Sequence, residues 1–368
     1  MQRYPNIFQY CALRTKNISD IFDLTKNTQF FCKPLYFGRD LRYNERINIR
    51  KIRIFRLPSK RKNGCSGYYP PDKAEERRVR RTQVFTMKTL GYYNGKFGPL
   101  DEMTVPMNDR VSYFGDGVYD ATYSRNYVIY ALDEHIDRFY NSAALLKIKI
   151  PHTKDEMKAL LCDMVKKLDD DEQFVYWQVT RGTGMRNHAF PDESVPANIW
   201  ITLKPAKVKD TYQKIKLITL EDTRFLHCNI KTLNLLPSVM AAQKTAEAGC
   251  DEAVFHRGDR VTECAHSNVH IIRDGVFVTA PTDHLILPGI ARAHLIKTAK
   301  QLGYAVDETP YTLDDLMNAD EVIVSSSGSF CLAASEVDGK KVGGRAPEML
   351  KALQDALVAD YIEKNDTV

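Results

Sequence analysis

The chain has 368 residues, 43% of them hydrophobic, which leaves room for roughly two domains of a globular protein. It contains no apolar run of about 18 residues or more, which excludes a membrane-spanning helix on sequence grounds. Eight cysteines form no Cys-x-x-Cys pair and no dense framework, so we expect reduced thiols in a cytoplasmic protein, without disulfides or structural zinc.

Residues 1–86 differ in charge from the rest of the chain. They carry 20 Lys and Arg against 7 Asp and Glu, whereas residues 87–368 carry 32 against 40. No sustained helical or strand period runs through the basic segment, so we expect no folded domain there. A basic RNA-binding arm is one alternative, and a targeting presequence is another that the segment's aspartates disfavour. We expect an upstream extension outside the functional protein, with Met87 as the natural start.

Residues 87–206 are expected to form a small domain rich in antiparallel strands. The stretch Tyr92–Phe97 contains Asn-Gly, the pair that favours a tight hairpin turn. Residues 174–180 and 198–203 have the composition of strands. The run 153–156 reads Thr-Lys-Asp-Glu, a capping box that predicts the start of a helix.

A second helix is expected to start near Asp133, which can cap it, with Ile136 and Phe139 on its apolar face. His135 and Arg138 would lie in its first turns, where backbone N–H groups and a guanidinium can jointly hold an anion. Without further context, an Arg138 on a solvated surface is the simpler interpretation.

The polar loop 181–188 lies between two predicted strands and carries Arg186 and His188. Because these residues are two apart, their side chains would project to the same side of an extended loop. Together they are suited to grip a carboxylate, with bidentate contacts from Arg186. The segment 205–210 is the best candidate for a linker between domains.

Residues 213–368 are expected to form a larger domain. Turns at 257–259 and 274–275 predict two hairpins. A helix is predicted to begin after Gly289, so that the amides of Ile290 and Ala291 lie at a positive helix end suited to phosphate. The hydroxyl-rich turn at 325–329 can complete a phosphate-binding cup.

Lys231 precedes four apolar residues at helical spacing: Leu235, Leu236, Val239 and Met240. We expect these neighbours to enclose its stem, and such desolvation lowers the pKa of a lysine and favours the amine that forms Schiff bases. A lysine ahead of apolar residues is more often a surface residue that snorkels, so this stretch alone does not decide between the two.

The combined motifs of residues 87–368 resemble the class IV aminotransferases, the fold-type IV pyridoxal-phosphate enzymes, and are most similar to their D-amino acid-specific branch. The resemblance implies an α/β (α+β) fold with a small antiparallel-rich domain, 87–206, and a larger cofactor-binding domain, 213–368. The matching blocks, in the family's order, are Tyr113–Tyr119, Glu134–Arg138, Val179–Thr183, Cys228–Leu236, Val261–Glu263, Ser267–Val269 and Leu287–Ile290.

The same resemblance implies roles in binding pyridoxal 5′-phosphate. Lys231 would hold the cofactor covalently and later move a proton, and Glu263 would keep the pyridine nitrogen protonated. Ala291 stands where the family has a hydroxyl residue, so one phosphate hydrogen bond worth about 1 kcal/mol would be missing. Leu287 would lie behind the ring, and the expected phosphate ligands are Arg138, Ser327 and the amides of Ile290 and Ala291.

Tyr119, Arg186 and His188 match the carboxylate trap of the D-specific enzymes, in which the Arg-x-His loop comes from the neighbouring subunit. The resemblance therefore implies a homodimer. His266 replaces a small residue beside the cofactor, where it would either alter substrate preference or face solvent. His266 and His270 lack a third ligand, so we expect no metal site.

The implied reaction is ping-pong transamination of a D-amino acid, such as D-alanine or D-glutamate, with a 2-oxo acid. The expected partners are therefore small molecules. Branched-chain L-amino acid aminotransferase and 4-amino-4-deoxychorismate lyase are alternatives of the same fold, and the Arg-x-His loop disfavours both. A nucleic-acid-binding protein acting through residues 1–86 is the alternative from another class.

Overall fold

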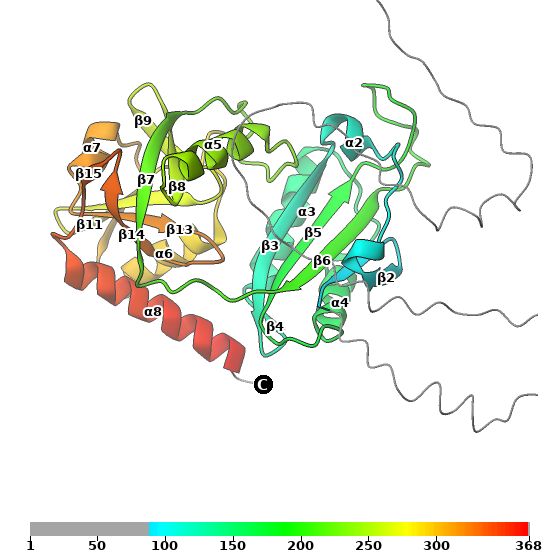
Figure 1. Ribbon diagram of the computed structural model, residues 1–368, viewed down its shortest axis with the longest axis horizontal. Helices are drawn as coiled ribbons and strands as arrows, with labels where there is room; N and C mark the ends of the chain where they lie inside the picture. The colour runs from blue at the N-terminus through cyan, green and yellow to red at the C-terminus, as the bar shows by residue number, and fades with distance from the viewer. Residues whose placement is uncertain (1–87, 367–368) are drawn as a thin grey trace, which may run out of the picture. The chain divides into compact units, whose positions relative to one another are not determined.

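The computed structural model describes residues 88–366, which form two β-sheets and the helices that cover them (Figure 1). The predictions for residues 1–86 lie outside the described residues. The first sheet has six strands in the order β2-β1-β6-β5-β3-β4, and all its pairings are antiparallel. Its strands are β1 (Leu90–Tyr93), β2 (Lys96–Pro99), β3 (Gly117–Arg125), β4 (Val128–Ile129), β5 (Gln173–Thr180) and β6 (Asn198–Pro205).

The hairpin predicted at Asn-Gly is confirmed. β1 and β2 pair across it, and both turn residues adopt positive φ angles, 45° at Asn94 and 89° at Gly95. A two-residue turn with two positive φ angles matches the right-handed twist of the strands on either side. A short 3-10 helix, η3 (Leu100–Glu102), and α2 (Arg110–Phe114) connect this hairpin to β3.

Helices α3 (Leu132–Leu145) and α4 (Lys154–Val165) pack with the first sheet around a core that includes Phe139, Leu161 and Trp177. The capping box at the start of α4 is confirmed. The prediction that Asp133 caps α3 is wrong: Ala131 holds the N-cap position with a φ of 52°. Asp133 lies inside the first turn, where its carboxylate pairs with Lys158 from α4.

The second sheet is mixed and has nine strands, eight of them in the order β12-β11-β10-β13-β14-β7-β8-β9, with β15 paired to β14. It curls so that β9 contacts β10, and apolar side chains such as Val254, Val261 and Val269 form a core cluster on these strands. Both predicted hairpins, β8–β9 and β10–β11, are confirmed. The strands are β7 (Lys214–Glu221), β8 (Glu252–Arg257), β9 (Arg260–Cys264), β10 (Asn268–Arg273), β11 (Val276–Thr279), β12 (Ala305–Asp307), β13 (Glu321–Ser325), β14 (Leu332–Val337) and β15 (Lys340–Lys341).

Four helices accompany the second sheet. Gly249 and Gly303 adopt positive φ angles just beyond two of them, as expected of glycines that end helices. Within residues 88–366, no helix combines the length and apolar character needed to cross a membrane. The helices are α5 (Leu236–Glu247), α6 (Ile290–Gln301), α7 (Leu313–Met317) and α8 (Pro347–Asp366).

The segment that carries Lys231 is fixed directly to strand β3 of the first sheet. The amide of Tyr119 donates to the carbonyl of Lys231 at 3.0 Å, and the amide of Leu233 donates to the carbonyl of Gly117 at 3.1 Å. A side chain at position 117 would collide with the carbonyl of Val179 and with Leu233, so only glycine allows this close approach. The backbone pairing therefore sets the position of the lysine relative to β3.

Candidate active site

A cavity of about 350 Å³ is lined by residues from both sheets. It brings together eight residues that the sequence assigned to cofactor or substrate binding, although they are spread over more than 200 positions of the chain. Arg186 and His188 do not line this cavity. The eight are Tyr119, Arg138, Lys231, Glu263, Leu287, Ile290, Ala291 and Ser327.

The amine of Lys231 lies 4.4 Å from the centre of the Tyr119 ring, and its Nζ makes no hydrogen bond or ion pair with any described residue. The expectation that the following apolar residues enclose its stem is wrong. Leu236, Val239 and Met240 are exposed, and α5 begins only at Leu236. Because Lys231 precedes the helix, helical spacing does not bring those side chains to it. The Tyr119 ring contacts the amine instead.

Arg138 is held from behind by a buried carboxylate that the sequence interpretation missed. Asp120 accepts from Nε of Arg138 at 2.9 Å and from its Nη2 at 2.7 Å. Burial alone would raise the pKa of Asp120, but Arg138 and His135 outweigh burial and hold that pKa well below its usual range. Asp120 therefore stays ionised and fixes Arg138 at the cavity wall, with Nη1 directed at the carbonyl of Pro288 at 3.3 Å.

His135 is also completely buried, and burial lowers its pKa although the neighbouring Asp120 acts in the opposite direction. A neutral imidazole carries one N–H, and its Nδ1 lies 2.7 Å from Asp120 Oδ1, so Nδ1 is the donor. Nε2 is then an acceptor for the hydroxyl of Ser327 at 3.3 Å. His135 thus links the helix that carries Arg138 to the serine-rich turn.

The start of α6 supplies backbone donors to the cavity. Gly289 occupies the N-cap without a side-chain hydrogen bond, and Ile290 and Ala291 follow it in the cavity lining. The first N–H groups of a helix have no carbonyl partner within the helix, and they lie at its positive end. Together with Arg138 they give this part of the cavity a set of donors suited to a phosphate group, which the Ser327 hydroxyl would join by turning from His135 to the ligand.

Glu263 lies in β9 and is buried among three donors. Its Oε1 accepts from Nη1 of Arg224 at 2.5 Å, and its Oε2 accepts from the Asn268 amide at 3.0 Å and from the Leu287 N–H at 3.1 Å. Burial raises the pKa of Glu263 to about 7, and Arg224 only partly opposes that effect. The carboxylate is thus poised between its two protonation states near neutral pH.

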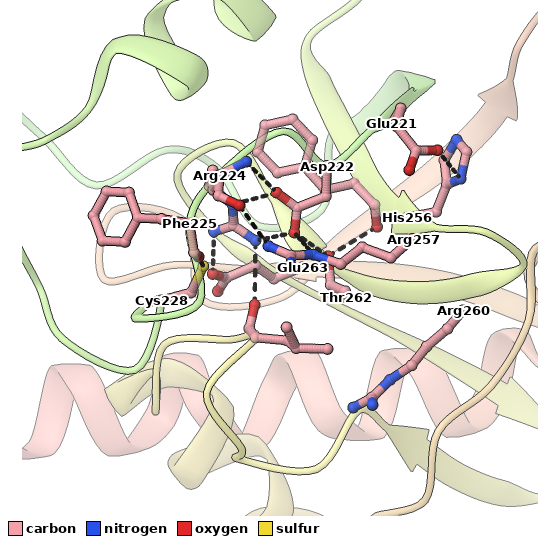
Figure 2. Close-up of polar contacts among 12 residues, drawn as sticks. Glu221, Asp222, Arg224, Phe225, Cys228, His256, Arg257, Arg260, Thr262 and Glu263 are labelled. Carbon is pink, nitrogen blue, oxygen red and sulfur yellow. Dashed lines mark hydrogen bonds and ion pairs between the residues drawn. The ribbon is translucent and has the colours of Figure 1, made fainter.

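Figure 2 shows that Arg224 contacts Asp222 as well as Glu263. Its Nε and Nη2 each donate to Asp222 at 3.0 Å, and Asp222 also accepts from Nε of Arg257 at 3.1 Å. Glu263 therefore belongs to one network in the cavity wall, together with a second carboxylate and two arginines: Asp222, Arg224 and Arg257. The sequence offers no local signal for this network, because Arg224 and Glu263 are 39 positions apart.

The loop that carries Arg186 and His188 is exposed and contacts α2 instead of the cavity. The guanidinium of Arg186 lies 5.4 Å from the centre of the Phe114 ring, and the His188 ring lies 5.2 Å from it. Both side chains are thus gathered on one aromatic residue. Neither of them lines the cavity that holds Lys231 in the same chain.

The family model described as amino-transferase class IV matches residues 117–337, which is more than half of the chain. The protein therefore belongs to the class IV aminotransferase family, as the sequence motifs predicted. This span includes every one of the eight cavity residues named above.

The chain is similar over most of its length to curated relatives named D-alanine aminotransferase. The protein from Listeria monocytogenes serotype 4b is 41% identical over 275 residues, which covers 73% of this chain and 94% of the relative. The protein from Bacillus licheniformis is 37% identical over 273 residues, covering 74% and 96%. Among solved structures, the T.th. branched-chain amino acid aminotransferase with pyridoxamine 5′-phosphate matches with a TM-score of 0.68 and 26% identity, covering 73% of this chain and 93% of that one.

Proposed function

We propose that the protein is a pyridoxal 5′-phosphate-dependent D-amino acid transaminase that acts on substrates such as D-alanine and D-glutamate. The observation that carries the proposal is the unpartnered amine of Lys231 in one cavity with Glu263 and Arg138. The relatives named D-alanine aminotransferase, at 37–41% identity, support the choice of D-amino acids.

The donor set of the cavity fits pyridoxal 5′-phosphate. Arg138, Ser327 and the amides of Ile290 and Ala291 suit the phosphate, and Ala291 supplies only its amide because its side chain has no hydroxyl. A carboxylate with a pKa of about 7, Glu263, suits the pyridine nitrogen. Leu287 lines the cavity, and its backbone N–H is committed to Glu263. The bound cofactor would serve as the electron sink for the carbanion formed at the substrate.

Within this site, Lys231 acts as the proton carrier. Its Nζ would take the proton from Cα of the amino acid and return it in the second half of the reaction. The backbone hydrogen bonds between residues 117–119 and 231–233 hold the lysine's backbone in place while its side chain moves. Arg224 restrains Glu263, so that the carboxylate keeps its orientation whether or not it carries a proton.

The carboxylate trap is proposed to form between two copies of the chain. Tyr119 lines the cavity, whereas Arg186 and His188 lie on an exposed loop outside it. Large apolar side chains are exposed on the same loop, with Met185 at 85% and Phe190 at 58%, as expected of a surface that a second subunit covers. A homodimer in which each loop serves the other subunit's cavity explains both features.

The first test uses the purified full chain with its cofactor. D-Alanine should change the visible absorption of the bound cofactor, and L-alanine should not. Lys231→Ala should reduce turnover by several orders of magnitude because nucleophile and proton carrier are lost together. Lys244→Ala, on the exposed side of α5, is the matched control and should keep full activity. Wild-type turnover by Lys231→Ala would overturn the assignment.

The second test asks whether the trap is shared between subunits. Arg186→Ala should reduce kcat/KM for D-alanine, because a charge-assisted contact to the carboxylate is lost. The reduction should correspond to about 2–4 kcal/mol of lost transition-state stabilisation. Lys231→Ala and Arg186→Ala subunits, each nearly inactive, should regain activity when mixed and allowed to exchange. The hybrid dimer then contains one site with both residues intact. Failure to recover activity would place Arg186 and Lys231 in the same subunit's site.

A branched-chain L-amino acid aminotransferase is the second candidate, because a solved structure of that name shares the fold at 26% identity. The higher identity to the D-alanine aminotransferases favours the first candidate. Transamination of L-leucine or L-valine faster than D-alanine would reverse the choice.

A further inference from the structure

Two basic side chains, Lys209 and His266, line the cavity without a part in the chemistry described above. Lys209 comes from the segment between β6 and β7, and His266 comes from the turn between β9 and β10. Lys209 has no ion pair with any described residue, whereas Lys207, two positions earlier, pairs with Glu172 at 2.8 Å. An ammonium group without a carboxylate partner beside a substrate cavity favours the binding of an anionic ligand there.

Strand β3 shows where Lys209 lies relative to Lys231. Tyr119, Ala121 and Tyr123 alternate along the strand and all line the cavity. Four residues of a strand span about 13 Å, so Tyr119 and Tyr123 mark two separate parts of this wall. Lys231 lies over the Tyr119 ring.

The Tyr123 end of the wall adjoins Lys209. A Cβ added to Gly328 would lie 2.8 Å from the Tyr123 ring, so the two residues are in close contact. The backbone amide of Lys209 donates to the carbonyl of Gly328 at 2.8 Å. The backbone of Lys209 therefore lies near the Tyr123 end of β3, whereas Lys231 lies near the Tyr119 end.

His266 lines the same cavity as Lys209. Its Nδ1 lies 2.9 Å from Oε2 of Glu252, a buried carboxylate that also accepts from the Ser267 hydroxyl at 2.7 Å. The hydrogen bond to Glu252 raises the pKa of His266, while the nearby Lys209 and Lys231 act against that rise. The imidazole is thus within electrostatic range of both amines. Its Nε2 has no partner among the described residues, and its side chain is 65% exposed, open to a ligand in the cavity.

The surrounding side chains suit an aliphatic chain that ends in an anion. Phe174 packs against Tyr123 on the neighbouring strand, and Ile215 adds further apolar lining to the cavity. Asp251 also lines the cavity, but its carboxylate already accepts the amide of Lys216 at 2.8 Å. Lys209 Nζ is thus left without a partner among the described residues, and a protonated His266, with its Nδ1 on Glu252, offers its Nε2–H as a second donor.

We propose that Lys209 and His266 form a subsite for the distal carboxylate of dicarboxylic substrates, so that these two residues set a preference for D-glutamate and its 2-oxo acid over substrates with short apolar side chains. The inference rests on the proposed transaminase function, because Lys231 determines where the reacting carbon lies. The substrate side chain extends from that carbon along β3 toward Tyr123. Its terminal carboxylate accepts from the Lys209 ammonium and from His266, which Glu252 orients.

The test compares two probes and two substrates on the holoenzyme. The substrates are D-glutamate and D-alanine, and the non-reacting probes are glutarate and butyrate, which differ in the second carboxylate. Lys209→Met and His266→Ser should each reduce kcat/KM for D-glutamate and weaken glutarate binding about tenfold or more, as expected for a lost hydrogen bond to a charged group. D-Alanine turnover and butyrate binding should change less than about threefold.

Lys207→Met is the matched control, because this lysine is exposed and already paired with Glu172 outside the cavity. Lys207→Met should leave unchanged the ratio of kcat/KM for D-glutamate to that for D-alanine, and also the ratio of glutarate to butyrate affinity. Equal losses for both substrates, or no loss for either, would overturn the subsite while leaving the transaminase function intact. If the wild-type holoenzyme transaminated neither substrate, the proposed function would fail, and the glutarate-to-butyrate binding ratio of the same variants would still decide the subsite.

Discussion

Asp120 and Glu263 are two buried carboxylates that each accept from an arginine, yet they differ in protonation. Asp120 stands behind Arg138 and keeps a pKa well below its usual range. Glu263 lines the cavity, and burial raises its pKa to about 7. Both residues are buried, with exposed fractions of 0% for Asp120 and 5% for Glu263, so burial does not explain the difference.

The difference lies in how each arginine distributes its N–H groups. Arg138 gives both Nε and Nη2 to Asp120, and His135 adds a third donor. Arg224 gives Nε and Nη2 to Asp222, so Glu263 receives only Nη1. A carboxylate with a bidentate arginine becomes a permanent anion, whereas one that shares its arginine with a second carboxylate can hold or release a proton near neutrality.

Removal of the permanent anion should have the largest effect on stability. Asp120→Ala leaves the Arg138 guanidinium buried without its counter-ion and should lower the free energy of unfolding by about 3–5 kcal/mol. Urea denaturation of the cofactor-free protein measures this loss. Asp137→Ala is the control on the same helix as Arg138; it removes an exposed pair with Lys154 of α4 and should cost less than about 1 kcal/mol. Similar losses in the two variants would contradict the role assigned to Asp120.

Glu263 should give the cofactor-free protein a pH-dependent stability that Asp120 does not. The folded pKa of Glu263, about 7, lies above its ordinary value of 4.5, so the folded state retains a proton that the unfolded state has already released. Stability contributed by this proton is complete below about pH 4.5 and is lost as pH rises toward 7 and above, by about 3 kcal/mol in all. Denaturation midpoints between pH 5 and 8 measure the slope.

Glu263→Gln removes the titrating group and should flatten that slope. The contribution of Asp120 has the opposite sign, because its folded pKa is depressed: it is present above the ordinary pKa of 3.8 and is lost only as pH falls below that value. Between pH 5 and 8 Asp120 adds nothing to the slope. An unchanged slope in Glu263→Gln would show that Glu263 is ionised throughout this range.

Local signals in the sequence predicted much of the fold. Asn94 and Gly95 gave the correct hairpin, and the capping box gave the start of α4. These features depend on a few neighbouring residues, so a sequence pattern contains them fully. The prediction for Asp133 failed because Ala131, with a positive φ, ends the preceding turn two residues earlier. A tertiary turn overrode the local preference there.

The cavity residues were found because they lie in family motifs, and the residues behind them were missed because no motif pattern connects them. Asp120 and Arg138 are 18 positions apart, and Arg224 and Glu263 are 39 apart. Each pair joins two segments that are separate along the chain, so its partners become visible only once the sheets are assembled. Lys231 shows the same limit, since its aromatic neighbour Tyr119 comes from a strand more than 100 positions earlier.

The smallest expected effect tests the neutral state of His135, on which the environment of Asp120 depends. Ser327→Ala removes the hydroxyl that lies 3.3 Å from His135 Nε2 and leaves a buried acceptor unsatisfied, which should cost about 1 kcal/mol of stability. Ser335→Ala, which removes a hydroxyl that donates to the Ile215 carbonyl at 3.2 Å, is the control on β14 and should cost no more than that. Nitrogen chemical shifts of His135 should report one protonated ring nitrogen in the wild type and in Ser327→Ala at neutral pH. Two protonated nitrogens would mean that His135 is a cation, and Asp120 would then owe its ionised state to two positive charges rather than to the Arg138 charge and a hydrogen bond from a neutral His135.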